Sequence, residues 1–171
     1  VALARQVVER MGGRKAFDQT RFLAFEFFGF RHLAWDRATN RVRVEGRSRG
    51  GEAYVVLFDL DDGKGRAWKD GVEVTDTVEL DEQIRGGMSA WINDFYWLLM
   101  PYKLEDPGVT IRIVGAKDMA DGNPADVIEV TFDAVGLTPN NKYHVYVARE
   151  SGLVEQWDFF LEASDAEPRM S

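Results

Sequence analysis

Hydrophobic residues recur at two different spacings along this chain, and the spacing changes after about twenty residues. In residues 2–14 they fall three or four positions apart, as Leu3, Val7 and Met11 do. This spacing predicts a short amphipathic helix. Gly12 and Gly13 can supply the left-handed backbone that ends it, and residues 14–19 then predict a further helical turn. From Phe22 to Phe30 the chain is dense in aromatic residues that share one face of an extended segment, which predicts a strand.

Alternating hydrophobic and polar positions then continue through most of the chain and predict an antiparallel meander. Turn-forming residues such as Gly50-Gly51 and Ser151-Gly152 separate the segments. About nine strands result, at residues 22–30, 32–36, 41–47, 53–60, 66–73, 109–115, 126–133, 142–149 and 153–162.

One helical segment interrupts this meander at residues 76–100, where apolar residues follow helical spacing over several turns. Asp76 followed by Glu79 predicts a capping box, Gly86-Gly87 predicts a division into two helices, and Pro101 predicts the end of the segment. Its second half has almost no polar face, so we expect the sheet to enclose it.

The sequence therefore predicts a mainly β (α+β) fold with an N-terminal helix and an inserted helix. A chain of 171 residues suits one domain, which we expect to cover residues 1–163, with residues 164–171 as a polar, frayed C-terminal tail. Because the chain begins at Val1 rather than Met, we also expect a leader, a lipidated N-terminus or a linker ahead of it.

Composition and charge narrow the function classes. Hydrophobic residues make up 45% of the chain and charged residues 29%, which argues against intrinsic disorder. The net charge of -8, from 21 basic and 29 acidic residues, disfavours a nucleic acid partner. The absence of cysteine excludes disulfides, thiolate metal sites and a cysteine nucleophile.

Short motifs for catalysis or cofactor binding find little support. Residues 46–50 match G-x-S-x-G, but they lie between two predicted strands rather than at a strand-to-helix turn. His32 and His144 lack neighbours at metal-ligand spacing, and residues 59–70 lack the glycine and glutamate of a calcium loop. No glycine pattern suits a nucleotide phosphate. We expect no catalytic residue, metal or cofactor, and hence no enzyme.

The remaining signal is an excess of aromatic residues on predicted inward faces, including five Trp and eleven Phe. A filled core explains these residues as well as an apolar cavity does. In the second case, the helix carrying Trp91–Met100 would be a lid or plug.

The order of elements and the stretches Phe22–Glu45, Trp91–Leu104 and Asp126–Glu162 resemble the LolA/LolB-like proteins and related outer-membrane lipoprotein-sorting proteins of bacteria. The resemblance implies a strongly curved antiparallel half-barrel with helices on its concave face. It also implies a periplasmic or outer-membrane-associated, non-enzymatic carrier, here expected to be a monomer, whose partner is a lipid, an acylated lipoprotein or another envelope protein.

In that family, an arginine on a strand is tied to the helical lid. The candidates on early strands here are Arg31, Arg41, Arg43 and Arg47, of which Arg41 and Arg43 point outward by strand alternation. Strand parity and helical spacing predict the following ligand-facing residues: Leu23, Phe25, Phe27, Val42, Val44, Val56, Phe58, Trp91, Phe95, Leu98, Tyr143, Trp157 and Phe159.

Two alternatives remain open. The same fold with a filled core would serve as a structural or interaction module of the envelope. A small hydrolase or isomerase would instead need polar groups such as His32, Asp36 or His144 to converge inside the sheet.

Overall fold

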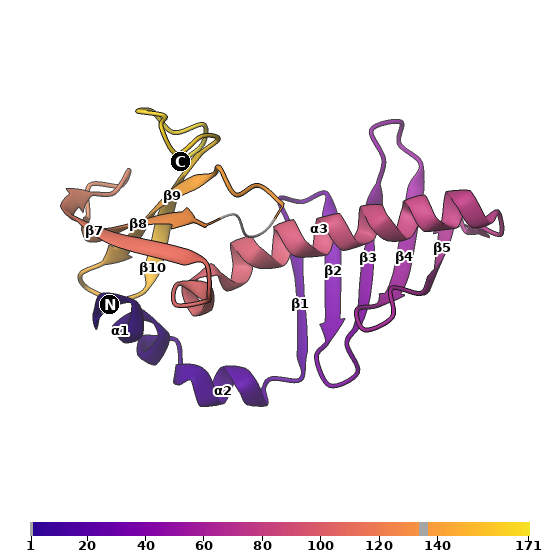
Figure 1. Ribbon diagram of the computed structural model, residues 1–171, viewed down its shortest axis with the longest axis horizontal. Helices are drawn as coiled ribbons and strands as arrows, with labels where there is room; N and C mark the ends of the chain where they lie inside the picture. The colour runs from indigo at the N-terminus through magenta and orange to yellow at the C-terminus, as the bar shows by residue number, and fades with distance from the viewer. Residues whose placement is uncertain (1, 134–136) are drawn as a thin grey trace. The chain divides into compact units, whose positions relative to one another are not determined.

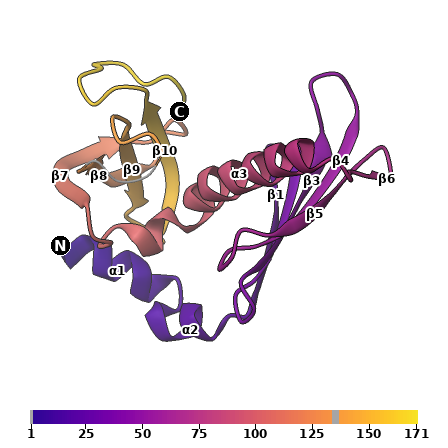
Figure 2. The same cartoon turned by 45° about the vertical axis from the view of Figure 1, so that its right-hand side comes forward.

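A computed structural model describes residues 2–133 and 137–171, which form ten strands in two antiparallel sheets together with three helices (Figures 1 and 2). The chain divides into two compact units: a central unit, Asp18–Trp97, and a terminal unit, Val1–Phe17 with Leu98–Ser171. The mainly β, antiparallel prediction is confirmed. A single half-barrel of about nine strands is not confirmed, and the single-domain assignment stays a prediction.

The central unit contains a six-stranded sheet in which every strand pairs with the next one along the chain. The predicted strand at residues 66–73 is interrupted, because Asp70 and Gly71 adopt left-handed backbone with φ of 47° and 82° and make a turn. The strands are β1 (Phe22–Phe27), β2 (Arg31–Asp36), β3 (Arg41–Arg47), β4 (Ala53–Asp59), β5 (Gly65–Lys69) and β6 (Val72–Glu73).

The strand register sorts the side chains of this sheet onto two faces. Val44 pairs with Leu33 on one side and with Val56 on the other, so these apolar residues share a face, which we call the covered face. Residues next to them in sequence, such as Arg43 and Leu57, lie on the opposite face.

Helix α3 (Thr77–Lys103) crosses the covered face, as Figures 1 and 2 show. Near its start, Glu79 accepts a 2.9 Å hydrogen bond from Lys69 of β5. Farther along, the Phe95 ring lies 4.9 Å from the ring of Phe25 on β1. The helix therefore spans the sheet from β5 to β1 and buries the apolar centre of the covered face.

The sequence signals of α3 are only partly confirmed. Asp76 caps the helix by accepting a 2.9 Å bond from the Glu79 N–H, but the Glu79 side chain pairs with Lys69 instead of closing a capping box. Gly86-Gly87 does not divide the helix, since packing on the sheet offsets the low helix propensity of glycine. The helix also passes Pro101, which removes a single backbone hydrogen bond near its end.

The terminal unit contains a four-stranded sheet in the order β10-β9-β8-β7. The predicted helix end at Gly12-Gly13 is confirmed, because these glycines have φ of 100° and 81° and turn the chain, and the further turn predicted at residues 14–19 lies within a second helix. The elements are α1 (Ala2–Arg10), α2 (Gly13–Gln19), β7 (Val109–Asp118), β8 (Pro124–Phe132), β9 (Lys142–Ala148) and β10 (Val154–Phe160). Across the described residues, none of the helices is both long and apolar enough to cross a membrane.

Tyr102, in the last turn of α3, connects that turn to the N-terminal helices. Its hydroxyl donates a 3.0 Å hydrogen bond to the Met11 carbonyl, and its ring stacks on Phe17 at 4.2 Å. Arg14 donates a 2.7 Å bond to the Tyr102 carbonyl. These contacts attach the N-terminal segment of the terminal unit to the last turn of α3.

The C-terminal tail, which the sequence predicts to fray, makes several hydrogen bonds to the rest of the terminal unit. The buried ammonium group of Lys142 donates hydrogen bonds of 2.9 Å and 2.7 Å to the carbonyls of Ala163 and Asp165. Farther on, the Phe159 N–H donates a 2.7 Å bond to the Met170 carbonyl. The tail is therefore tied to β9 and to β10.

The close approach of α3 to the sheet predicts unequal effects for its two adjacent glycines. A Cβ on Gly87 would lie 3.1 Å from side-chain carbons of Phe58 and Val56, whereas a Cβ on Gly86 meets nothing within 4 Å. We expect Gly87→Leu to lower the free energy of unfolding by about 1–3 kcal/mol through overpacking. Gly86→Leu should raise it by up to about 1 kcal/mol through helix propensity.

Urea denaturation followed by circular dichroism measures both changes. Equal effects of the two substitutions would contradict the close contact between Gly87 and the covered face.

Candidate functional site

Most of the predicted ligand-facing residues lie together in the central unit, on the covered face and on α3. Those at its centre are 1–3% exposed, and those nearer β1 are half-buried. The helix thus seals the middle of the face and leaves the β1 side partly accessible. The buried residues are Val42, Val44, Val56, Phe58 and Phe95, and the half-buried residues are Leu23, Phe25, Phe27 and Trp91.

The other predicted residues belong to the terminal unit. Tyr143 lies with its ring 5.3 Å from Phe159 and 6.2 Å from Trp157, on one face of the four-stranded sheet. Burial raises the pKa of Tyr143 to about 12. Leu98 is 41% exposed on α3. The predicted set is therefore brought together as two clusters, one within each unit.

A buried ion pair joins α3 to the covered face. The guanidinium of Arg31 donates hydrogen bonds of 2.6 Å and 2.7 Å to the two carboxylate oxygens of Asp94, whose side chain is 0% exposed. Asn93 donates a further 2.8 Å bond to the same carboxylate. Burial lowers the pKa of Arg31, but the hydrogen bonds and charge of Asp94 outweigh it and leave this pKa above its usual value. We call this pair the Arg31–Asp94 clamp.

Aromatic rings surround the arginine of the clamp. Its guanidinium lies 5.5 Å from the ring centre of Phe27 and 4.9 Å from that of Phe30. Tyr54 pairs across the strands with Gly46, where a Cβ would lie 2.6 Å from the Phe30 carbonyl oxygen and 3.0 Å from the Tyr54 hydroxyl. Burial raises the pKa of Tyr54. Glycine at position 46 thus leaves room for a large polar ring beside the clamp.

Arg31 is one of four arginines that strand position made candidates, and Asp94 was not among the residues predicted from the sequence. Strand pairing places Arg31 opposite Phe27 on the covered face, while Arg41, Arg43 and Arg47 are exposed. A signal for Asp94 exists in the sequence: it is an acidic residue three positions after Trp91, on the apolar side of the helix. The inward-facing Leu33 and Trp35 of β2 were also missed, although they alternate as a strand requires.

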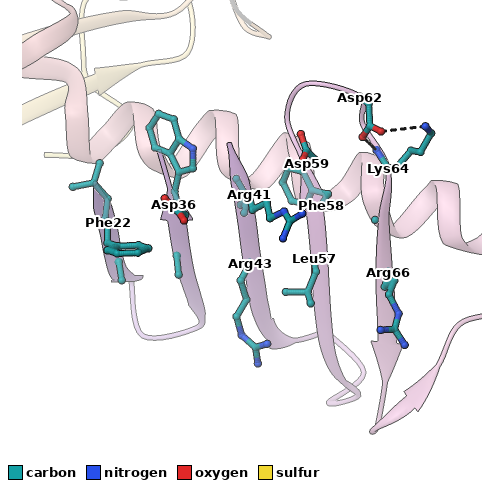
Figure 3. Close-up of a pocket in the computed structure, with 16 residues that line it drawn as sticks. Phe22, Asp36, Arg41, Arg43, Leu57, Phe58, Asp59, Asp62, Lys64 and Arg66 are labelled. Atoms are coloured by element: carbon teal, nitrogen blue, oxygen red, sulfur yellow. Dashed lines mark hydrogen bonds and ion pairs between the residues drawn. The ribbon is translucent and has the colours of Figure 1, made fainter. Parts of the chain in front are cut away.

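The opposite face of the central sheet carries an open hollow of about 730 Å³, which Figure 3 shows. Ala24 and Ala34 are cross-strand partners, and their small side chains leave space between larger neighbours. The labelled side chains in Figure 3 include several charged groups, among them Lys64, which pairs with Asp62 at 3.1 Å. The hollow is lined by Phe22, Leu23, Ala24, Ala34, Trp35, Asp36, Arg41, Val42, Arg43, Leu57, Phe58, Asp59, Asp62, Lys64, Gly65 and Arg66.

The polar residues considered for catalysis, His32, Asp36 and His144, are not grouped inside the central sheet. His32 is exposed and lies 3.4 Å from Glu26. His144 belongs to the terminal unit, where it lies 3.3 Å from Glu129 and burial lowers its pKa. Asp36 is bound by Arg21 on the opposite face. Within residues 2–133 and 137–171, no group of three or more His, Asp or Glu side chains is arranged to hold a metal ion.

The clamp predicts a large cost for removing one partner. Arg31→Leu leaves the Asp94 carboxylate buried without its cation, and we expect the free energy of unfolding to fall by about 3–5 kcal/mol. Arg31→Leu combined with Asp94→Leu should recover most of this loss, because no charge is then left buried. Urea denaturation of the two single variants and the double variant measures the coupling.

Arg43→Leu is the matched control, since Arg43 is exposed and pairs with Glu45 on the same strand. It should change stability by less than about 1 kcal/mol. A loss for Arg31→Leu no larger than for this control would show that the clamp is dispensable.

The ion pair between Arg21 and Asp36 predicts a low titration midpoint. Two hydrogen bonds of 2.8 Å and 3.0 Å from Arg21 lower the pKa of Asp36 from 3.8 to about 2. Because the folded-state pKa lies below the ordinary value, the pair stabilises the fold above pH 3.8 and this contribution disappears as the pH falls towards 2. Carbon NMR titration of the carboxyl group should show this midpoint, and Arg21→Ala should move it back towards 3.8.

Two comparisons with known proteins were negative. No protein-family model matches the chain, and none of the curated proteins matches it. The function must therefore be inferred from the chemistry of the covered face, α3 and the clamp.

Proposed function

We propose that this protein is a non-enzymatic binding protein of the bacterial envelope that holds a lipid, or the acyl chains of a lipoprotein, on the covered face beneath α3. In this proposal α3 is the lid and the Arg31–Asp94 clamp holds it closed. A LolA/LolB-like half-barrel, a periplasmic or outer-membrane-associated location and a monomeric state are parts of the same proposal.

The observation that carries the proposal is a charged clamp on the apolar side of α3, where the helix meets the covered face. A permanent core does not need such a pair, since hydrophobic replacements of a buried ion pair are often equally stable. A bidentate pair instead fixes one closed geometry. Arg31 is 22% exposed at its side chain, so water can reach it when the pair separates. These properties suit a helix that closes in one register and opens.

The energetics of an acyl chain fit this role. Lifting α3 exposes apolar surface, and a bound chain replaces that surface with its own. Each buried methylene contributes about 0.8 kcal/mol, so ten methylenes contribute about 8 kcal/mol. This is enough to offset separation of the clamp without any specific polar contact.

A structural or interaction module with a filled core is the second candidate. It is favoured by the near-complete burial of Val44, Val56 and Phe58, which are 1–3% exposed beneath α3. Native mass spectrometry of protein purified from cells, with lipid analysis of an organic extract, separates the two functions. An acyl-bearing adduct that extraction removes supports the carrier, and a bare 19.4 kDa mass supports the module.

Nile red, a neutral apolar dye, provides a second test in solution. We expect Asp94→Asn to increase dye affinity several-fold, because weakening the clamp populates the open state. Trp97→Asp should decrease affinity, because its ring packs 6.5 Å from Phe27 at the accessible β1 side and a charge there is costly.

Arg43→Ala is the control for both variants, because Arg43 lies on the opposite face, and circular dichroism reports whether each variant folds. If the dye binds none of these proteins, or binds all of them equally, the covered face is not the binding surface.

A further inference from the structure

Two half-buried indole rings meet between α3 and the covered face, and within the described part of the chain their buried N–H groups have no hydrogen-bond acceptor. The Nε1 atoms of Trp35 on β2 and Trp91 on α3 are both inaccessible to solvent, and neither has a hydrogen-bond partner among the residues that the structure describes. The two rings lie 5.4 Å apart and nearly perpendicular, at 84°. Buried tryptophan N–H groups ordinarily find an acceptor, so a pair of unsatisfied donors at one place calls for an explanation.

The side chains around these donors are mostly apolar, apart from the guanidinium of Arg37, which lies 5.6 Å from the ring centre of Trp35. The Phe95 ring lies 5.5 Å from Trp35 and 6.2 Å from Trp91, and Val42 is the strand neighbour of Trp35. The nearest acidic residue along the helix, Asp94, already accepts hydrogen bonds from Arg31 and Asn93. Turning Asp94 towards the indoles would break the clamp, so it cannot satisfy them in the closed state.

The choice of side chain points to an acceptor on a ligand. Phenylalanine would fill an apolar contact without adding a donor, and the chain uses it at Phe25 and Phe95 on the same surfaces. Tryptophan brings an N–H group whose burial costs free energy unless it is paired. An acyl chain linked through an ester or amide carries a neutral carbonyl oxygen into the same apolar space.

We propose that Trp35 and Trp91 recognise the carbonyl oxygens of an ester- or amide-linked acyl chain, each indole N–H donating a hydrogen bond to one of them. This inference rests on the proposed function and specifies its ligand class. A free fatty acid is a poorer ligand, because its carboxylate would enter the apolar surroundings of Phe95. Of the cations near the two indoles, Arg31 is paired with Asp94, and Arg37 donates a 2.8 Å hydrogen bond to the Thr20 carbonyl. Pure hydrocarbons and ether lipids lack the acceptor.

The test compares two lipids that differ only in this carbonyl: dipalmitoylglycerol and its dihexadecyl ether analogue. Displacement of bound Nile red measures their affinities. Two neutral hydrogen bonds should make the ester bind about tenfold more tightly than the ether. Trp35→Phe and Trp91→Phe should each reduce this preference severalfold, with little change in affinity for the ether.

Trp68→Phe is the matched control. Trp68 pairs with Val55 on the opposite face, and Arg66 lies 4.9 Å from its ring centre. This substitution should leave the preference for the ester unchanged. Circular dichroism confirms that each variant folds.

Nitrogen NMR gives a readout independent of affinity. The five tryptophans provide five indole N–H signals, which single Trp→Phe variants assign. The signals of Trp35 and Trp91 should move downfield on addition of the ester and not of the ether.

Equal affinities for ester and ether would overturn the inference while leaving the acyl-chain carrier intact. Indole signals that show contact with water and do not respond to the ester would overturn it as well, because water would then satisfy the donors. If neither lipid displaces the dye or enters the site, the proposed function fails together with the inference.

Discussion

The buried carboxylate of Asp94 is the constraint on which the central unit depends. A charge with no exposed surface must meet a cation, and Arg31 supplies it through two short hydrogen bonds. This requirement fixes both the rotation of α3 and its position along the sheet. With Asp94 in place, the helical repeat directs Trp91 and Phe95 onto the same aromatic surface. Apolar packing alone would allow several registers of similar energy.

Sequence patterns located the apolar surfaces well and the polar partners poorly. Alternation placed Val42 and Val44 on one face, and helical spacing placed Trp91 and Phe95 on one side of a helix. Those patterns depend on local periods, which the chain itself displays. The partner of Arg31 depends on where a helix some sixty residues later crosses the sheet, and no local period contains that information. The same limit explains the second sheet, since alternation predicts strands but not their grouping.

In the proposed carrier, closure and recognition would lie one helical turn apart on α3. Asp94 provides the charged contact that holds the helix, and Trp91 presents an N–H group that the closed state leaves without an acceptor. The contact between α3 and the sheet is thus strong at Asp94 and leaves a hydrogen-bond donor unsatisfied at Trp91. In the proposed carrier, a ligand carbonyl completes the second contact while its chain competes with the helix for the aromatic surface. Affinity would then reflect the balance of two neighbouring positions.

The hydrogen bonds of the C-terminal tail have a consequence for self-association. β10 is the outermost strand of its sheet, and such a strand offers unpaired backbone groups to other chains. Phe159 of β10 is paired instead with Met170, and the backbone N–H of Arg169 donates a 2.6 Å hydrogen bond to the Phe159 carbonyl. Lys142 of β9 holds the segment between β10 and Met170 through its hydrogen bonds to the carbonyls of Ala163 and Asp165. The last residues therefore cover part of an edge strand. Because they are mostly polar, this edge of the sheet presents a surface that favours contact with water over contact with a second molecule.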